Sequence, residues 1–159
     1  LGLKLCGLHA MDSCRTEKAY RHFGHDITGE DHVVEAGLGF AVRDNKASDF
    51  IGRDAVLRKR EEGLSRRFVQ FRALDPDVML YHNEPILRDG AIVGYLTSGN
   101  YGHALGGAIG LGYVPCLEKG ETPADMLASR YQLEVADRIV DVEASLKPMY
   151  DPRSDRIRL

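Results

Sequence analysis

The chain of 159 residues carries a formal net charge of -3, and 43% of its residues are hydrophobic while 28% are charged. This length and composition suit one ordinary core or two small packed units, and they exclude disordered and fibrous proteins. The slightly acidic balance removes the electrostatic argument for nucleic-acid binding. No run approaches the roughly 18 consecutive apolar residues of a membrane span, and the first residues lack a signal-peptide layout, so we expect a soluble protein without a membrane partner.

The cysteines point to a reducing compartment. Cys6, Cys14 and Cys116 are odd in number and fit no C-x-x-C spacing, which argues against a disulfide framework and against a closed zinc site. We therefore expect a cytoplasmic location. Cys6 with His9 admits two interpretations, an activated thiolate or a small buried thiol, and the apolar run LKLCGL favours the buried thiol.

Residues 8–43 mix short helical and extended signals, and no long periodic helix is predicted there. Six potential metal ligands lie close together in this stretch: His22, His25, Asp26, Glu30, Asp31 and His32. Their spacing fits no regular element that would direct three of them at one point, so we interpret the histidines as surface or turn residues and predict no metal site. By pattern alone, the charged residues Arg15, Glu17 and Lys18 fit the polar face of a strand.

The segment DFIGRDAVLRKREEG, residues 49–63, predicts a short surface helix. Gly52 is a tolerable N-cap, and Asp54 lies in the first turn, where the helix dipole favours an anion. Gly63 suits the left-handed position that follows a last helical turn. Phe50 and Ile51 are expected to anchor the start of this helix.

Strand signals dominate after Gly63. Apolar and polar residues alternate in RFVQFRAL at 67–74 and again at 131–135 and 140–144, as half-buried strands require. In PILRDGAIVGYL, the Asp89-Gly90 pair predicts a hairpin, because glycine tolerates the positive φ of a type I′ turn. Several short strands at close spacing predict a small antiparallel barrel or sandwich.

The glycine-rich segment GGAIGLGYVP, residues 106–115, invites comparison with a phosphate-binding loop. It matches neither G-x-G-x-x-G nor G-x-x-x-x-G-K-[ST], and no helical pattern follows it. We interpret it as a strand in which glycines let neighbouring backbones approach closely.

Four segments carry a family resemblance when they are taken in order: GLHAMDSCRTEKAYRHFGHDITGED, VEAGLGFAVR, DFIGRDAVLRKREEG and YLTSGNYGHALGGAIGLGYVP. Together they resemble the folate-dependent aminomethyltransferase family of the glycine cleavage T-protein. The run from Glu17 to Asp26 is more similar to the C-terminal folate domains of dimethylglycine and sarcosine dehydrogenases than to stand-alone T-proteins. In those relatives a flavin domain oxidises the N-methyl amine, and the T-like domain passes the one-carbon unit to tetrahydrofolate.

The resemblance implies an α+β fold in which residues 1–63 end a folate-binding domain and residues 64–159 form a C-terminal antiparallel β-barrel. It implies the C-terminal part of an enzyme that transfers a one-carbon unit from a small amine (glycine, sarcosine or dimethylglycine type) to tetrahydrofolate, with any FAD on an upstream domain of the parent chain. The family's catalytic acid would lie upstream of Leu1, so no catalytic residue is assigned, and this segment alone is expected to be inactive.

Two residues match positions that lie at or near the folate in the family, namely Arg15 and Tyr20. A guanidinium offers a planar, charge-assisted fork to a carboxylate or a pterin edge, and a tyrosine ring offers stacking area. The competing interpretation is that both side chains support the structure of this pocket and do not contact the folate. Met11 stands where family members usually have an arginine that helps to hold the folate, so weaker folate binding is expected. The dehydrogenase relatives often have an apolar residue at this position, so Met11 also supports that branch. Two alternative functions stay open: a folate-dependent demethylase of a sulfonium or amine, and a non-catalytic scaffold.

Overall fold

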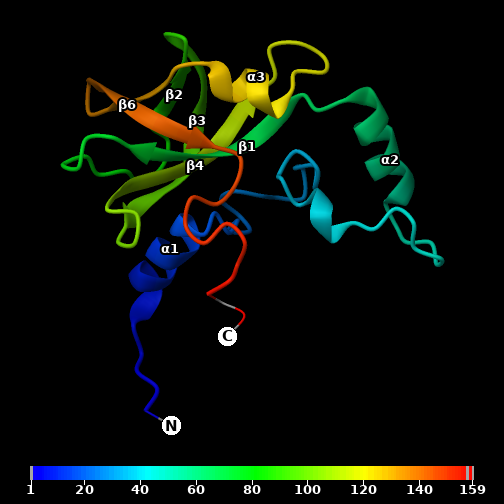
Figure 1. Cartoon of the computed structure of the whole chain (residues 1–159), viewed down its shortest axis with the longest axis horizontal. Coiled ribbons are helices and arrows are strands. Elements are labelled where there is room, and N and C mark those ends of the chain that lie inside the picture. The colour runs from blue at the N-terminus through cyan, green and yellow to red at the C-terminus, as the bar shows by residue number, and fades with distance from the viewer. Residues whose placement is uncertain (1, 157, 159) are drawn as a thin grey trace.

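A closed barrel of six antiparallel strands, with spatial order β1-β4-β3-β2-β5-β6, dominates the computed structural model, which describes residues 2–156 and 158 (Figure 1). The strands are β1 (Arg66–Ala73), β2 (Pro85–Arg88), β3 (Ala91–Gly102), β4 (Gly107–Pro115), β5 (Tyr131–Val135) and β6 (Arg138–Ser145). The helical elements are α1 (Gly7–Glu17), η1 (Gly39–Ala41), α2 (Arg53–Glu62) and α3 (Pro123–Ala128). The predicted α+β class with an antiparallel barrel is confirmed.

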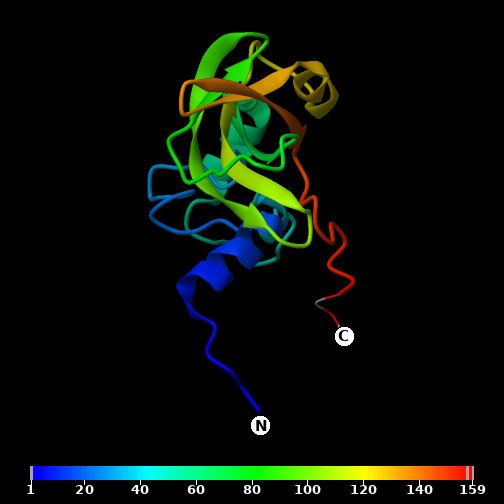
Figure 2. The ribbon, with the colours of Figure 1, turned by 90° about the vertical axis from the view of Figure 1, so that its left-hand side faces the viewer.

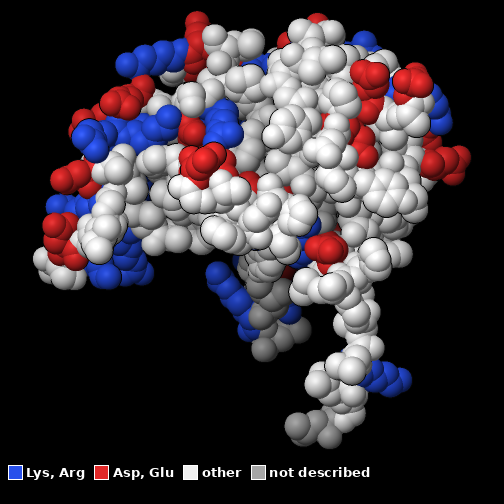
Figure 3. All heavy atoms as spheres, turned by 180° about the vertical axis from the view of Figure 1, so that it is seen from behind, with Lys and Arg blue, Asp and Glu red and all other residues white. Residues whose placement is uncertain are grey.

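The helices lie around the barrel rather than within it. Figures 1 and 2 place α1 below the barrel and α3 beside its upper end, while α2 lies to one side. Seen from behind, acidic and basic side chains are interspersed over the α2 side, and few charges occupy the middle of the face (Figure 3). No helix among the described residues is long and apolar enough to cross a membrane.

Alternate residues of β1 fill the barrel, as the period-two pattern predicted. Val69 and Phe71 are fully buried, and Ala73 is nearly so. Gln70 points to the other face and is also buried. Its amide nitrogen donates to the carbonyls of Thr16 (2.7 Å) and Glu17 (3.0 Å), which satisfies this polar group away from water. Its amide oxygen accepts from the backbone N–H of Met149 at 2.8 Å. One side chain of β1 therefore holds both the end of α1 and the C-terminal segment against the barrel.

The glycines predicted to shape the strands do so in two ways. Asp89 and Gly90 have φ of 51° and 85° between β2 and β3, so the predicted tight hairpin is confirmed. In β4, a Cβ at Gly110 would lie 2.5 Å from the side chain of Leu96. One at Gly112 would lie 2.7 Å from the carbonyl oxygen of Tyr95. The interpretation of residues 106–115 as a tightly packed strand is confirmed.

A buried ion pair closes the end of the barrel next to α3. The side chains of Arg88 and Glu121 are 3% and 4% exposed, and their charged atoms approach to 2.5 Å. Arg88 also donates from Nε to the hydroxyl of Ser129 at 2.9 Å, and its guanidinium lies 5.9 Å from the ring centre of Tyr131. Glu121 in turn accepts from the backbone N–H of Leu117. The pair therefore joins β2, α3 and the loop after β4.

Three local predictions were wrong, and one helix was predicted well. Residues 7–17 form the helix α1 with Lys18 as its C-cap, so Arg15, Glu17 and Lys18 do not form the polar face of a strand. Cys6 is exposed rather than buried, and all three cysteines are free. Helix α2 runs from its N-cap Gly52 to its C-cap Gly63 with Asp54 in the first turn, as predicted. Ile51, however, is fully exposed and so anchors nothing among the described residues.

Glu35 connects the end of α2 to the start of β1. Its carboxylate accepts from Lys59 at 2.6 Å and from the backbone N–H and hydroxyl of Ser65 at 3.0 and 2.7 Å. Arg66 adds a contact at 3.3 Å. Burial alone would raise the pKa of Glu35, but the hydrogen bonds from Lys59 and Ser65 outweigh it and lower the pKa from 4.5 to about 2. The ionised form is therefore favoured by the fold.

This shift makes a pH dependence testable. Because the folded pKa of Glu35 lies below the unfolded one, the stabilisation is present above pH 4.5 and is lost as the pH falls toward about 2. We expect the Glu35 contribution to the free energy of unfolding to decrease by about 2 kcal/mol over that window. Urea denaturation at several pH values checks this against Glu35→Gln. An equally steep loss in the variant would contradict the assignment.

Candidate functional site

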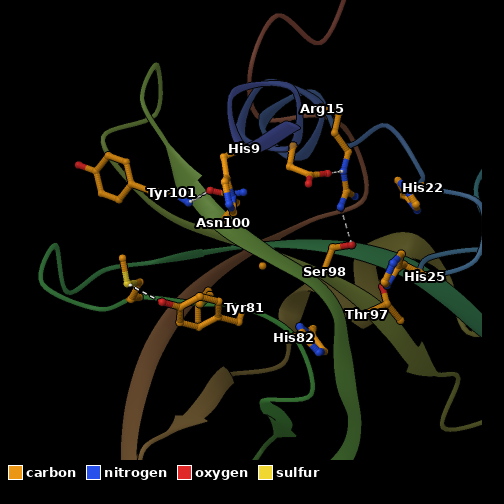
Figure 4. A pocket seen from close by; sticks show the side chains of 14 residues that line it. His9, Arg15, His22, His25, Tyr81, His82, Thr97, Ser98, Asn100 and Tyr101 are labelled. Atoms are coloured by element: carbon orange, nitrogen blue, oxygen red, sulfur yellow. Dashed lines mark hydrogen bonds and ion pairs between the residues drawn. The ribbon is translucent and has the colours of Figure 1, made fainter. Parts of the chain in front are cut away.

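A cavity of about 400 Å³ lies between α1 and β3 and contains most of the chain's histidines (Figure 4). We call it the histidine cavity. Its walls come from His9, Asp12 and Arg15 of α1, and from segments 22–25, 79–82 and 97–101. Segments far apart in sequence thus meet at one site, and β3 forms its floor.

Arg15 lies on the α1 wall with its guanidinium directed at β3 (Figure 4). Each of its three nitrogens donates once: Nε to Asp12 at 3.0 Å, Nη1 to Asp26 at 2.7 Å and Nη2 to Ser98 at 3.0 Å. A guanidinium has five N–H donors, so two stay available beyond these contacts. Arg15 therefore ties α1 to the barrel and still has donors for a ligand.

Asp26 is the buried centre of this network and is only 1% exposed. One carboxylate oxygen accepts from Arg15 and from the backbone N–H of His22 at 2.8 Å. The other accepts from the hydroxyl of Thr97 at 2.5 Å. The charge is thus paired and hydrogen-bonded, as a buried carboxylate requires. Asp26 fixes the 22–26 turn, α1 and β3 in one arrangement.

Gly99 sets the depth of the cavity floor. A Cβ at this position would lie 2.6 Å from the backbone nitrogen of Tyr81 and 2.7 Å from the carbonyl carbon of Leu80. Only a glycine lets β3 approach the 79–82 segment so closely. Hydrogen bonding also holds that segment, because the carboxylate of Glu84 accepts from the N–H of Tyr81 at 2.8 Å.

Four of the six histidines line the cavity: His9, His22, His25 and His82. The rings of His22 and His25 meet edge to face with centroids 4.8 Å apart. Among the described residues, no three His, Cys, Asp or Glu side chains converge as metal ligands. Nδ1 of His22 is buried and has no hydrogen-bond partner in the described part of the chain. His22 therefore lines the cavity while one of its ring nitrogens stays buried and unpaired within the described part of the chain.

The two residues singled out from sequence do not share a cavity. Tyr20 is 50% exposed and lines a second cavity of about 520 Å³ near the C-terminal segment. Met11 lies on α1 outside both cavities and is 49% exposed. Sequence reasoning missed Asp26 and Ser98 as partners of Arg15, and Thr97 as a second partner of Asp26. The Thr97-Ser98 pair offered only a weak signal, because hydroxyl residues in a strand are common.

The donors and rings of the histidine cavity fit a flat, polar ligand. Tyr81 and Tyr101 supply aromatic area, and Asn100 and the imidazoles supply hydrogen-bonding groups. A volume of about 400 Å³ is within the range of small-molecule sites. Rings with hydrogen-bonding edges, such as heteroaromatic cofactors, match this combination of stacking and polar contacts.

Two family models match the chain in succession. The glycine cleavage T-protein C-terminal barrel domain matches residues 66–151, and the GCVT N-terminal domain matches residues 1–46. A crystal structure of the glycine cleavage system aminomethyltransferase T from Bartonella henselae is similar, with a TM-score of 0.74 and 25% identity. The match covers 90% of this chain and 38% of that one.

Curated relatives include longer enzymes. The chain is 39% identical to 4-methylaminobutanoate oxidase (formaldehyde-forming) of Paenarthrobacter nicotinovorans and 34% identical to human mitochondrial sarcosine dehydrogenase. Each alignment covers 99% of this chain but only 18% and 17% of the relative. An aminomethyltransferase of Halothermothrix orenii is 45% identical over 72% of the chain and 31% of its own length. Because the barrel model alone covers more than half of the sequence, the chain belongs to the glycine cleavage T-protein family.

Proposed function

We propose that this chain is the C-terminal part of an enzyme that passes a one-carbon unit from an N-methylated amine to tetrahydrofolate. The observation that carries the proposal is the alignment over 99% of the chain with sarcosine dehydrogenase and 4-methylaminobutanoate oxidase. Both names denote substrates with a methylamino group, and the second also names formaldehyde as a product. Aminomethyltransferases among the relatives support the acceptor side of the same reaction.

The division of the chain follows from this proposal. Residues 1–63 would complete a folate-binding domain, and residues 64–159 would form the barrel that covers it. Gly63 supports a boundary there, because its φ of 88° ends α2 and turns the chain into β1 within three residues. Upstream domains of the parent chain would supply the amine site and any flavin.

The histidine cavity is the site that we propose for folate, because its volume of about 400 Å³ and its polar and aromatic lining suit a small heteroaromatic ligand. The two remaining N–H groups of Arg15 suit the polar edge of a pterin or a carboxylate. The rings of Tyr81 and Tyr101 would stack on the ligand. Tetrahydrofolate, when bound, supplies the nitrogen nucleophiles that accept the one-carbon unit. This chain's residues would orient it and exclude water, so their contribution is proximity rather than covalent chemistry.

Binding of a reduced folate tests the Arg15 assignment. We expect Arg15→Ala to weaken binding of 5-formyltetrahydrofolate about tenfold, since hydrogen bonds to charged groups contribute about 1.5–3 kcal/mol. Isothermal titration calorimetry of the folded variants gives this ratio directly. Arg43→Ala is the matched control, because Arg43 is exposed and lies outside the cavity.

Two further variants keep the test decisive. Arg15→Lys preserves the charge next to Asp26 and should retain the fold while losing the planar fork. Because Tyr20 lines the second cavity, Tyr20→Ala should leave folate affinity unchanged if folate occupies the histidine cavity, whereas a loss of affinity would support the sequence prediction that Tyr20 contacts the folate. Unchanged affinity in Arg15→Ala and Arg15→Lys would remove Arg15 from the site. Failure of the parent protein to bind any reduced folate would favour a scaffold role, and methyltetrahydrofolate as the product would favour a demethylase.

A further inference from the structure

The fixed charges of the histidine cavity are mostly negative. Arg15 is the only guanidinium or ammonium group among the described residues that line it. This guanidinium already forms ion pairs with Asp12 at 3.0 Å and with Asp26 at 2.7 Å. At another wall, the carboxylate of Glu84 accepts from the backbone N–H of Tyr81 at 2.8 Å. Three carboxylates therefore accompany one guanidinium, and negative charge is in excess while the imidazoles are neutral.

Four imidazoles line the same cavity, on walls that come from three parts of the chain. His9 belongs to α1, His22 and His25 belong to the turn that follows this helix, and His82 lies close in sequence to Glu84. In the view of Figure 4, His9 lies on one side of the Arg15 side chain, and His22 and His25 lie on the other. Imidazole is the side chain that ordinarily gains or loses its charge between pH 5 and 8.

The remaining polar groups of the lining keep one charge state near neutral pH. Strand β3 supplies hydroxyl, amide and phenol groups from Thr97, Ser98, Asn100 and Tyr101, and Tyr81 adds a second phenol. Such groups are uncharged between pH 6 and 8, whereas carboxylates and guanidinium groups stay charged over that range. The lining that the structure describes therefore changes its charge in this range only at its imidazoles.

Three of the four imidazoles are open to solvent. His9, His25 and His82 are exposed, and His22 is half-buried. The rings of His22 and His25 lie only 4.8 Å apart, so a charge on one opposes a charge on the other. Protons on the three exposed imidazoles outnumber the two carboxylate charges that Arg15 leaves unbalanced. Acidification would therefore change the sign of the charge in the cavity.

We propose that the histidine cavity is a proton-linked site, which binds an anionic ligand together with protons on its exposed imidazoles. Near pH 8 the excess carboxylates oppose an anion, and near pH 6 imidazolium N–H groups bind it by charge-assisted hydrogen bonds. The inference rests on the proposed function, because it concerns the same cavity and the glutamyl carboxylates of folate supply the anion. It adds that binding is regulated by pH, through histidines that the sequence left as surface residues.

Calorimetric titration with 5-formyltetrahydrofolate at pH 6 and pH 8, at constant ionic strength, tests the proposal. We expect about tenfold tighter binding at pH 6, because several imidazolium contacts each contribute a few tenths of a kcal/mol or more. Carboxylates of the ligand are ionised at both pH values, so the change in affinity comes from the protein. Equal affinity at the two pH values, or tighter binding at pH 8, would overturn the proposal.

Histidine variants identify the groups that take up the protons. The double variant His25→Gln with His82→Gln should reduce the ratio of the two affinities to less than about threefold, because glutamine stays neutral. His103→Gln is the matched control, since His103 is exposed but does not line the cavity, and it should keep the tenfold ratio. A merely structural role would weaken binding equally at both pH values. An unchanged ratio in a double variant that retains the parent melting temperature would also overturn the proposal.

Sulfate tests the cavity without folate, because its charge does not change between pH 6 and 8. Nuclear magnetic resonance of the 159-residue chain should show saturable shifts of the ring signals of His9, His25 and His82 with sulfate at pH 6. The ring signals of His32 and His103 should stay in place, since neither residue lines the cavity. This response without any folate binding would remove the proposed function and leave the proton-linked anion site. Equal shifts of all six histidines would indicate general screening and overturn it.

Discussion

Arg88→Met is expected to lower the free energy of unfolding by about 3–5 kcal/mol, the cost of leaving one partner of a buried ion pair uncompensated. Glu121 would then be a carboxylate whose side chain is only 4% exposed, and its remaining hydrogen bond among the described residues comes from the backbone N–H of Leu117. The hydrogen bond from Arg88, outweighing burial, lowers the pKa of Glu121, so the carboxylate is ionised in the native protein. The variant would also lose the contact with Ser129 that fixes the end of α3.

Urea denaturation of three variants separates this effect from a general loss of charge. Arg130→Met removes an arginine from an exposed pair with Asp141, whose side chains are 67% and 52% exposed, and should cost under about 1 kcal/mol. The double variant Arg88→Met with Glu121→Leu should recover much of the loss, because no charge stays buried. If Arg88→Met and Arg130→Met lower the free energy of unfolding by the same amount, the buried Arg88–Glu121 pair does not hold the end of the barrel together.

Gly99→Ala should destabilise the chain by about 3 kcal/mol and abolish ligand binding in the histidine cavity. The added Cβ would meet the backbone of Leu80 and Tyr81 at 2.6–2.7 Å. Backbone atoms cannot rotate away as the end of a side chain can, so β3 and the 79–82 segment must separate. The cavity floor would then shift relative to Arg15.

Thermal unfolding together with a 5-formyltetrahydrofolate titration checks this expectation. Gly29→Ala serves as the control, because a Cβ there meets nothing within 4 Å and the residue does not have a positive φ. A Gly99→Ala protein with the melting temperature and folate affinity of the parent would show that the contact is not rigid.

Strands β1, β5 and β6 were predictable because their apolar side chains alternate with polar ones, so the period of two appears in the sequence. Strand β4 is buried along almost its whole length and was predicted from its glycines instead. Helix α1 was not predictable by the same logic. Its buried residues are Ser13, Thr16 and Glu17, while Leu8 and Met11 are 72% and 49% exposed. This is the reverse of an ordinary amphipathic pattern, because polar side chains of α1 bond to the barrel. Hydrophobic periodicity therefore carries no signal for this helix.

The candidate site was predictable only in part. Arg15 was singled out through the family resemblance, but its partners Asp26 and Ser98 lie on other elements, and no local spacing connects them. The histidines looked like unrelated surface residues because His9 and His82 are brought together only by the packing of α1 and segment 79–82 around β3. Long-range contacts of this kind require the barrel topology, which the sequence pattern alone does not specify.

Closure of the barrel has a consequence for how the chain is made. Strand β1 pairs with β6, so Phe71 and Ala73 meet Ala144 and Val142 only after most of the chain has left the ribosome. Until then one edge of β1 has no partner, and an unpaired edge is a template for pairing with other chains. A nascent chain that stalls before β6 would therefore be prone to aggregate, and a chaperone that covers β1 during translation would favour correct closure.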